Sequence, residues 1–271
     1  MMMTMFRCSK SMKMMLGVCI FMIAVCCSCL SAGRSSSAGI GKRQAPASTP
    51  IDNLTEEEIM DNLKKLVNLF SEMVENEGNG RWKNIAVGPK AFELMRDSLP
   101  LRVKGELTPY TRIVLLGQMM GTMPERDCAR FFMQVKEYQK SMFPLISSED
   151  LAEDMDIDGY EGDPEMYVRQ FTLQVLEAGI RRTAEYLDTN VPMEEWCDRY
   201  GVWLKFDPVE RTEKWEKCIY EVEKECDRKL RNESRGMGFC HSYWSTKRAV
   251  LAKHGIKWSS PSMMNPGVMF D

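Results

Sequence analysis

Residues 154–165 space acidic side chains in the way that a bound calcium ion requires. Calcium takes roughly six to eight oxygen ligands, and carboxylates at alternate positions of a short loop converge on one point. Gly159 follows the third carboxylate, where such a loop must turn sharply. We therefore predict calcium as a cofactor, with oxygen ligands from Asp154, Asp156, Asp158, the backbone carbonyl of Tyr160, and Glu165.

The acidic segment resembles an EF-hand calcium loop over residues 154–165. It departs from that family at Glu161, where an aliphatic residue usually pairs with a second loop, and the sequence has no second loop of this pattern. The resemblance implies one weak site, with a dissociation constant of about 10⁻⁴ to 10⁻³ M, as in extracellular modules. The alternative is a surface loop in which Asp163 merely caps the following helix.

A basic start followed by an apolar run predicts a secretory signal peptide over residues 1–32. Arg7, Lys10 and Lys13 precede the uncharged segment 14–30, and small residues follow it. Because this segment has the minimum length that can span a bilayer, a retained membrane anchor is the alternative. After cleavage we expect a secreted protein with no stable membrane insertion.

Residues 33–50 are rich in Ser, Ala, Gly and Pro and are predicted to form a flexible linker or propeptide. Within them, Gly41, Lys42 and Arg43 place a glycine before a basic pair. This motif resembles the cleavage and amidation signal of neuropeptide precursors. The resemblance implies cleavage after Arg43, with Gln44 as the new N-terminus.

Two glycosylation motifs, at Asn53 and Asn232, agree with a secretory route. Five cysteines remain after the signal peptide, and in an oxidising compartment they allow at most two internal disulfides. The fifth thiol would be free, buried, or bonded to another chain, and the last case would give a disulfide-linked dimer. The pairing stays open, except between Cys218 and Cys226. These two lie eight residues apart on one predicted helix, which separates them by roughly 12 Å along its axis, too far for a disulfide bond. The candidates for disulfide bonds are Cys128, Cys197, Cys218, Cys226 and Cys240.

Helix signals recur through residues 51–271. Thr55 and Glu58 form a capping-box pattern before apolar residues at helical spacing, and Gly78-Asn79-Gly80 ends that helix. Prolines open further predicted helices, including a long charged helix over 208–231. No alternating segment predicts a strand. We therefore expect a mostly α, disulfide-stapled extracellular domain over residues 51–271, behind the signal peptide and linker.

Composition and motifs argue against several functions. The first 43 residues hold six basic residues and no acidic one, which leaves 30 basic and 39 acidic residues in the remainder. Such an acidic body disfavours nucleic acid as a partner. Cys240-His241 is adjacent in sequence and so does not predict a nucleophile and its base, and nucleotide-binding and hydrolase motifs are absent from the sequence. We expect that the protein is not an enzyme.

Aromatic and basic residues interleave near the C-terminus, around Tyr243, Trp244, Lys247 and Trp258. We interpret them as core packing, with lysine head groups reaching solvent, rather than as a nucleic-acid surface. The sequence thus predicts a secreted, non-enzymatic binding protein whose partner is an extracellular protein or receptor of unknown identity. The alternative is a prohormone or neuropeptide-like precursor cleaved at Lys42-Arg43.

Overall fold

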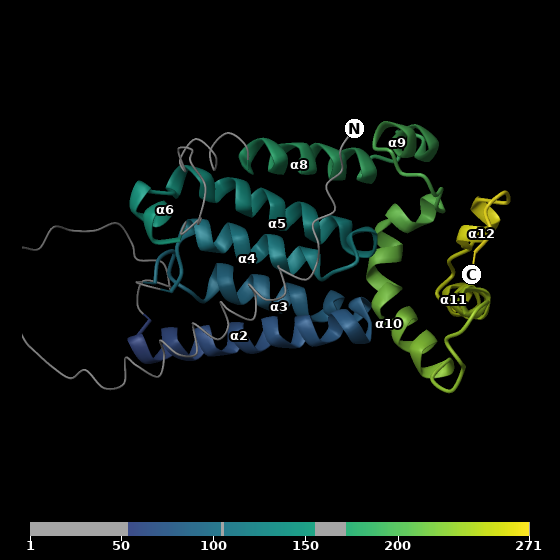
Figure 1. The fold of residues 1–271 in the computed structure, drawn as a ribbon, viewed down its shortest axis with the longest axis horizontal. Coiled ribbons are helices and arrows are strands. Elements are labelled where there is room, and N and C mark those ends of the chain that lie inside the picture. The colour runs from purple at the N-terminus through teal and green to yellow at the C-terminus, as the bar shows by residue number, and fades with distance from the viewer. Residues whose placement is uncertain (1–53, 104–105, 155–171, 271) are drawn as a thin grey trace, which may run out of the picture.

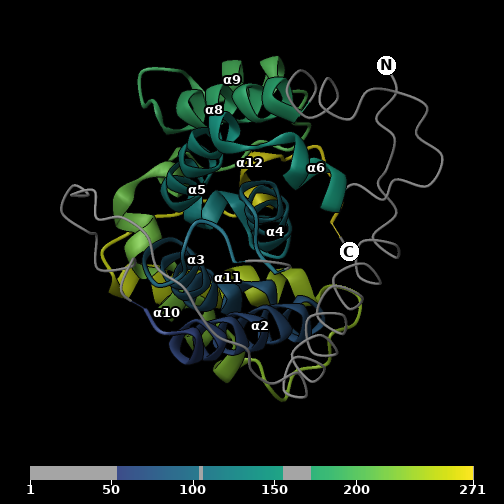
Figure 2. The same ribbon diagram turned by 90° about the vertical axis from the view of Figure 1, so that its left-hand side faces the viewer.

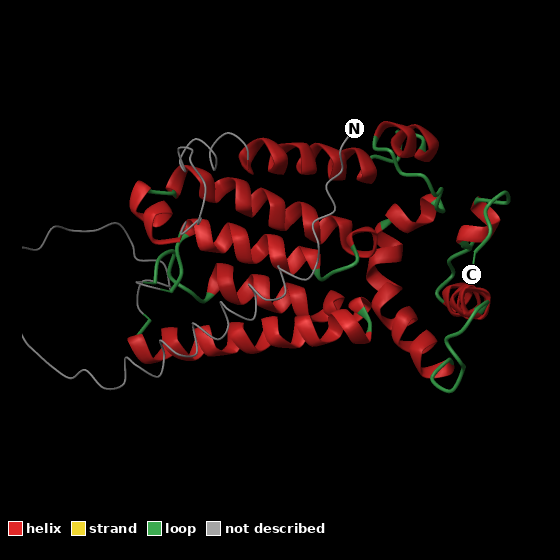
Figure 3. Cartoon of the chain, in the orientation of Figure 1, coloured by secondary structure: helices red, strands yellow, loops and turns green. Residues whose placement is uncertain are grey.

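The computed structural model describes residues 54–103, 106–154 and 172–270, and these are mostly helical, as predicted. Figure 3 shows helices joined by loops, and within these ranges the one β-type contact is an isolated bridge between Val103 and Leu107. The predicted signal peptide, the linker with Gly41, Lys42 and Arg43, the acceptor Asn53, and loop residues 155–165 lie outside the described residues.

The first described helix, α2 (Glu56–Asn79), begins as its capping box predicts. The Thr55 side chain accepts a hydrogen bond from the Glu58 backbone N–H at 3.2 Å, and the Glu58 carboxylate accepts one from the Thr55 N–H at 2.8 Å. Its buried side chains recur at helical spacing, and they are Leu63, Leu66, Phe70 and Met73. This face forms the main core together with the next three helices.

A second helix, α3 (Asn84–Asp97), follows a short 3-10 turn, η3 (Arg81–Lys83), and it has no clear signal in the sequence. Its interior contains Gly88 and Pro89, a pair that usually marks a turn. A Cβ at Gly88 would lie 2.5 Å from the sulfur of Met123, so the glycine lets this segment approach the chain that follows α4. Tertiary packing therefore keeps this segment helical against its local preference.

Five helices form a stack in which α2 packs on α3, α3 on α4, α4 on α5, and α5 on α8. Figure 1 shows them side by side, and Figure 2 shows the same stack turned by 90°. Short connections join α2 to α3 and α4 to α5, and they favour antiparallel packing of these neighbours. The remaining elements of the stack are α4 (Pro109–Gly121), η4 (Glu125–Cys128), α5 (Ala129–Met142), η5 (Phe143–Leu145), α6 (Ser148–Asp154) and α8 (Leu173–Leu187).

One buried guanidinium fixes the turn between α3 and α4. Arg112, on α4, is 1% exposed and donates hydrogen bonds to the backbone carbonyls of Met95, Leu99, Pro100 and Leu101. These carbonyls belong to the last turn of α3 and to the residues that follow it. Carbonyls at the end of a helix have no partner within the helix, and Arg112 supplies one. A fully hydrogen-bonded arginine therefore sets the antiparallel order of the two helices.

The C-terminal elements lie across the end of the stack. In Figure 1, α10 crosses the right-hand ends of the stacked helices, and α11 and α12 lie beyond it. The helix predicted over 208–231 is two elements, because Thr212 adopts an extended conformation and caps a new helix by accepting a hydrogen bond from the Trp215 N–H. These elements are α9 (Met193–Arg199), η7 (Pro208–Arg211), α10 (Glu213–Lys229), α11 (Phe239–Lys253) and α12 (Pro261–Met264).

The predicted disulfide staples are not present among the described residues, where Cys128, Cys197, Cys218, Cys226 and Cys240 are all free thiols. The reason is their placement. Cys128 belongs to the core of the stack, Cys197 to the core around α9, and Cys226 to the core between α10 and α11. Cys218 and Cys226 lie on one helix and do not pair, as expected from their spacing. Within the described part, no helix has the length and apolar character needed to cross a membrane.

Candidate functional site

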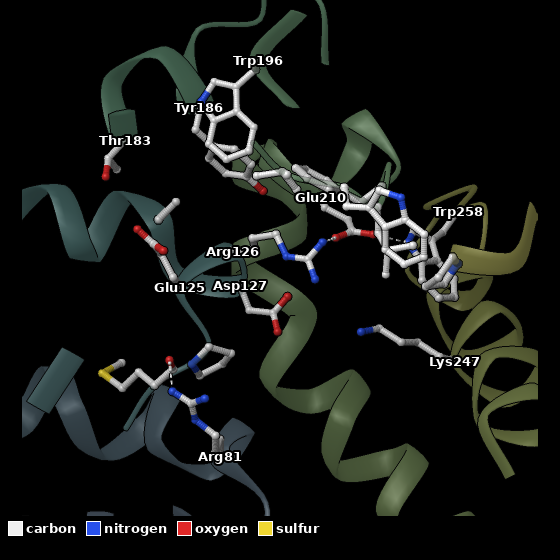
Figure 4. Close-up of a pocket in the computed structure, with 18 of the residues that line it drawn as sticks. Arg81, Glu125, Arg126, Asp127, Thr183, Tyr186, Trp196, Glu210, Lys247 and Trp258 are labelled. Carbon is white, nitrogen blue, oxygen red and sulfur yellow. Dashed lines mark hydrogen bonds and ion pairs between the residues drawn. The ribbon is translucent and has the colours of Figure 1, made fainter. Parts of the chain in front are cut away.

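A pocket of about 850 Å³ opens where the end of the stack meets the C-terminal elements. Its walls come from η4, α8, α9, the loop 202–206, η7, α11 and the segment around Trp258. Figure 4 shows this pocket, with Arg126 and Glu210 near its centre and Lys247 and Trp258 on one side. Residues more than a hundred positions apart in the sequence thus share one cavity.

Three buried rings form one wall, which we call the aromatic triad: Tyr186, Trp196 and Phe206. Their centroids lie 5.3 Å apart for Tyr186 and Trp196, 5.9 Å for Tyr186 and Phe206, and 6.0 Å for Trp196 and Phe206. The rings come from α8, α9 and the loop before η7. Each ring contacts the other two, so the wall is a continuous apolar surface of fixed geometry.

Two guanidinium groups stack on the aromatic triad. Arg126 lies 4.7 Å from the Phe206 centroid, and Arg182 lies 5.5 Å from the Trp196 centroid. Such cation–π contacts orient the planar groups without using up their N–H donors. The Nε of Arg182 is buried and has no hydrogen-bond partner in the described part of the chain.

Tyr186 brings a second unpartnered polar atom to the pocket. The residue is 4% exposed, and its buried hydroxyl makes no hydrogen bond to any described residue. Burial raises the pKa of Tyr186, the Glu210 charge raises it further, and the Arg126 charge opposes the shift. Figure 4 places Tyr186 between Trp196 and Arg126. An unpaired buried hydroxyl destabilises a fold by about 1–3 kcal/mol.

Glu210 is a nearly buried carboxyl on η7 and lines the same pocket. Its Oε1 accepts a hydrogen bond from the Trp258 indole at 2.8 Å, and its Oε2 lies 3.7 Å from the Arg126 guanidinium. Asp207 fixes the turn by accepting hydrogen bonds from the N–H groups of Val209 and Ser259. Burial raises the pKa of Glu210, and Arg126 opposes that shift without cancelling it.

The wall opposite the aromatic triad has every buried charge paired. The Lys247 ammonium donates to the Glu223 carboxylate at 2.7 Å and lies 4.9 Å from the Trp215 centroid, and the Tyr243 hydroxyl donates to the same carboxylate at 2.6 Å. Burial acts to lower the pKa of Lys247, but Tyr243 and Glu223 outweigh it and raise that pKa. The expectation that lysine head groups here reach solvent is wrong for Lys247, because Glu223 neutralises it inside the core.

The residues predicted from sequence as sites lie away from this pocket or outside the described residues. Asp154 ends α6, whereas Asp156, Asp158, Tyr160 and Glu165 are not described, and in the described ranges no three potential metal ligands gather at one point. Asn232 lies in an exposed turn after α10. The pocket residues Arg126, Tyr186 and Glu210 carry no shared local motif, so sequence reasoning had no signal that could join them.

Comparison with known proteins adds no relative: no protein-family model, no curated protein and no solved structure matches the chain. The arrangement of the pocket is therefore the basis for assigning a function. Its chemistry combines an aromatic wall, two stacked guanidinium groups, a buried carboxyl and two polar atoms without partners.

The raised pKa of Glu210 predicts a pH-dependent effect of the substitution Glu210→Gln. A carboxyl whose pKa is higher in the folded than in the unfolded chain destabilises the fold above its folded pKa, and this effect vanishes below the unfolded value. Glutamine keeps the acceptor for Trp258 and carries no charge. We expect a larger free energy of urea unfolding for the variant at pH 7.5, with the gain fading as the pH falls to about 4.

The matched control is Glu213→Gln at the exposed start of α10, where the carboxylate pairs with Lys217 at 2.6 Å. This change should give no gain in stability at any pH, because exposed pairs contribute little. A Glu210→Gln protein that is less stable than the wild type at pH 7.5 would contradict the prediction, since it would mean that Arg126 stabilises the charged carboxylate.

Proposed function

We propose that the protein is a secreted, non-enzymatic binding protein that takes a small amphipathic molecule into the pocket beside the aromatic triad. The observation that carries this proposal is that two residues lining the pocket, Tyr186 and Arg182, each have a buried polar atom, Oη and Nε, with no hydrogen-bond partner among the described residues. Buried polar groups in folded proteins are almost always hydrogen-bonded, and an exception calls for an explanation. A bound molecule that supplies the missing partners provides one.

The size and composition of the pocket support this proposal. Small-molecule sites have volumes of roughly 300–1,000 Å³ and combine apolar walls with a few placed polar groups. The present pocket, at about 850 Å³, falls in that range. Its polar groups converge beside the aromatic triad, so a molecule with one polar end and one apolar body would satisfy both features.

Trp203 extends the apolar surface at the edge of the pocket. Its side chain is 79% exposed, although the loop that carries it is fixed on both sides. The Val202 N–H donates to the Cys197 carbonyl at 2.8 Å, and the Asn265 amide bonds both the N–H and the carbonyl of Lys205 at 2.9 and 2.7 Å. A tryptophan held in solvent by such a fixed loop is positioned to cover a bound molecule.

A non-enzymatic role is supported by the raised pKa values of two buried thiols. Burial raises the pKa of Cys226 to about 12 and raises the pKa of Cys128 further still. Because the thiolate is the nucleophile, these cysteines are unreactive at neutral pH. Lys247, the lysine of the pocket wall, is held as a cation by Glu223 and is not a free amine.

The pocket is tested with N-phenyl-1-naphthylamine, an uncharged apolar fluorophore. We expect saturable binding of one molecule, with enhanced probe fluorescence and quenching of the tryptophans. Trp203→Ala should weaken binding by about 2- to 10-fold, since it removes one stacking surface. The control Trp82→Ala changes a tryptophan that packs on Tyr220 outside this pocket, and it should leave the affinity unchanged. Equal losses of affinity in both variants would contradict the proposal.

The second candidate function is a precursor cleaved after Arg43. It is supported by the position of Lys42-Arg43 in the sequence, before the first described helix, which begins at Glu56. Secretion itself is supported by the exposed turn at Asn232, where a glycan would meet no packed neighbour. Its partner would be an extracellular receptor that binds the released peptide or the remaining domain.

The measurement is the intact mass of protein purified from culture medium, with and without reduction. For the precursor we expect a chain beginning at Gln44, whereas a chain beginning near residue 33 would contradict cleavage. Free thiols at all five cysteines would give a monomer whose mass does not change on reduction. A dimer that separates on reduction would instead assign one of these cysteines to an interchain bond.

We also propose that residues 154–165 bind one calcium ion weakly. The support is the acidic spacing, together with the short helix α6 that ends at Asp154, the first proposed ligand. At a calcium concentration ten times the dissociation constant, binding would stabilise the fold by about 1.4 kcal/mol. We expect millimolar calcium to raise the melting temperature of the wild type and not that of Glu165→Gln. An unchanged melting temperature in the wild type would rule the site out.

A further inference from the structure

We infer that the molecule bound in this pocket is an organic anion, with a carboxylate-like or sulfonate-like group on an aromatic or apolar body, held by Arg126, Arg182 and Tyr186. This inference rests on the proposed binding function and specifies its ligand class. It follows from which polar atoms of the pocket are satisfied within the protein and which are not.

The unsatisfied atoms of the pocket are donors. Arg182 Nε carries one N–H and no lone pair that could accept, so only an acceptor can pair with it. The Tyr186 hydroxyl can also donate. Arg126 adds a cation whose side chain is 55% exposed and whose contact with Glu210, at 3.7 Å, is long for a hydrogen bond. A ligand that completes this site must therefore bring acceptor atoms.

The acceptors of the pocket already have partners in the protein. Glu210 accepts from Trp258, and Asp127 accepts from the Trp215 indole at 2.9 Å. Glu125 pairs with Lys136 at 3.3 Å. A cationic ligand would have to compete with these contacts, and it would leave Arg182 Nε and the Tyr186 hydroxyl no better paired. An anion pairs with the free donors and competes for one existing contact, the long ion pair between Arg126 and Glu210 at 3.7 Å.

The body of the ligand is specified by the aromatic triad. Both guanidinium groups stack on it, Arg126 on Phe206 and Arg182 on Trp196, so an anion bound to either group lies beside an apolar surface. Guanidinium groups bind carboxylates through paired N–H donors, which also fixes the orientation of the anion. A flat or aliphatic body attached to that anion would then lie against the rings.

The test compares two fluorophores that share one skeleton. 1-Anilinonaphthalene-8-sulfonate carries an anionic group, and N-phenyl-1-naphthylamine lacks it. We expect the wild-type full chain to bind the sulfonate about tenfold or more tightly than the uncharged probe, the effect of one or two charge-assisted hydrogen bonds. 2-Naphthoate, a carboxylate, should displace the sulfonate, whereas 2-naphthol should displace it only weakly.

Tyr186→Phe separates a ligand contact from a structural role. Because the hydroxyl has no partner in the protein, its removal should leave the urea midpoint unchanged or raise it, while sulfonate affinity falls about tenfold and that of the uncharged probe stays the same. Tyr243→Phe is the matched control for stability, because that hydroxyl donates to the buried Glu223 carboxylate and its loss should lower the urea midpoint. Arg182→Met should reproduce the selective loss of sulfonate binding.

The outcomes separate this inference from the proposed function. Tight sulfonate binding that is lost selectively in Tyr186→Phe and Arg182→Met supports the inference. Equal affinity for both probes, unchanged in either variant, overturns the anion assignment and leaves the pocket as an apolar binding site. Failure of both probes to bind with saturation overturns the inference together with the binding function.

Discussion

The contact between Trp215 and Asp127 joins the two parts of this protein. Trp215 is completely buried on α10, and its indole donates to the Asp127 carboxylate on η4, 88 positions earlier in the chain. Its ring lies 6.2 Å from Trp258 and under the Lys247 ammonium. One side chain therefore links the end of the helical stack to α11 and to the C-terminal segment. Together with the hydrogen bonds from Arg130 to the Glu216 carboxylate and the Arg211 carbonyl, this contact holds α10 across the end of the stack, beside the pocket.

Around this joint, the two walls of the pocket differ in how completely their polar groups are satisfied. On one side, Lys247, Glu223 and Tyr243 form a closed network in which the buried charges neutralise each other. On the other side, Tyr186 and Arg182 keep polar atoms without partners. Buried networks stabilise a fold only when every member is paired, so an incomplete wall facing a complete one needs a reason. An anion bound as inferred above would supply the acceptors that these two pocket residues lack.

Glu210 reaches the pocket because the chain interrupts a helix. Residues 208–211 form a 3-10 turn, and the extended conformation of Thr212 separates that turn from α10. Arg211 stabilises the turn by donating to the carbonyls of Asp188, Thr189 and Val191 after α8. If residues 208–229 formed one continuous helix, Glu210 would belong to the first turn of α10. The break instead places its carboxyl between Trp258 and Arg126, where burial raises its pKa.

Local chemistry determined much of the fold. The capping box at Thr55, the proline that opens α4 and the spacing of the apolar residues of α2 predict those helices, because each signal acts within one or two turns of the chain. Tertiary contacts decided the rest. The helix through Gly88 and Pro89 exists because it packs closely against Met123. Cys128, Cys197 and Cys226 are unpaired because folding places them in three separate cores. The pocket is lined by residues that lie far apart in the sequence. Hydrogen bonds and ring contacts over such distances leave no pattern in the sequence, since only the folded chain brings their partners together.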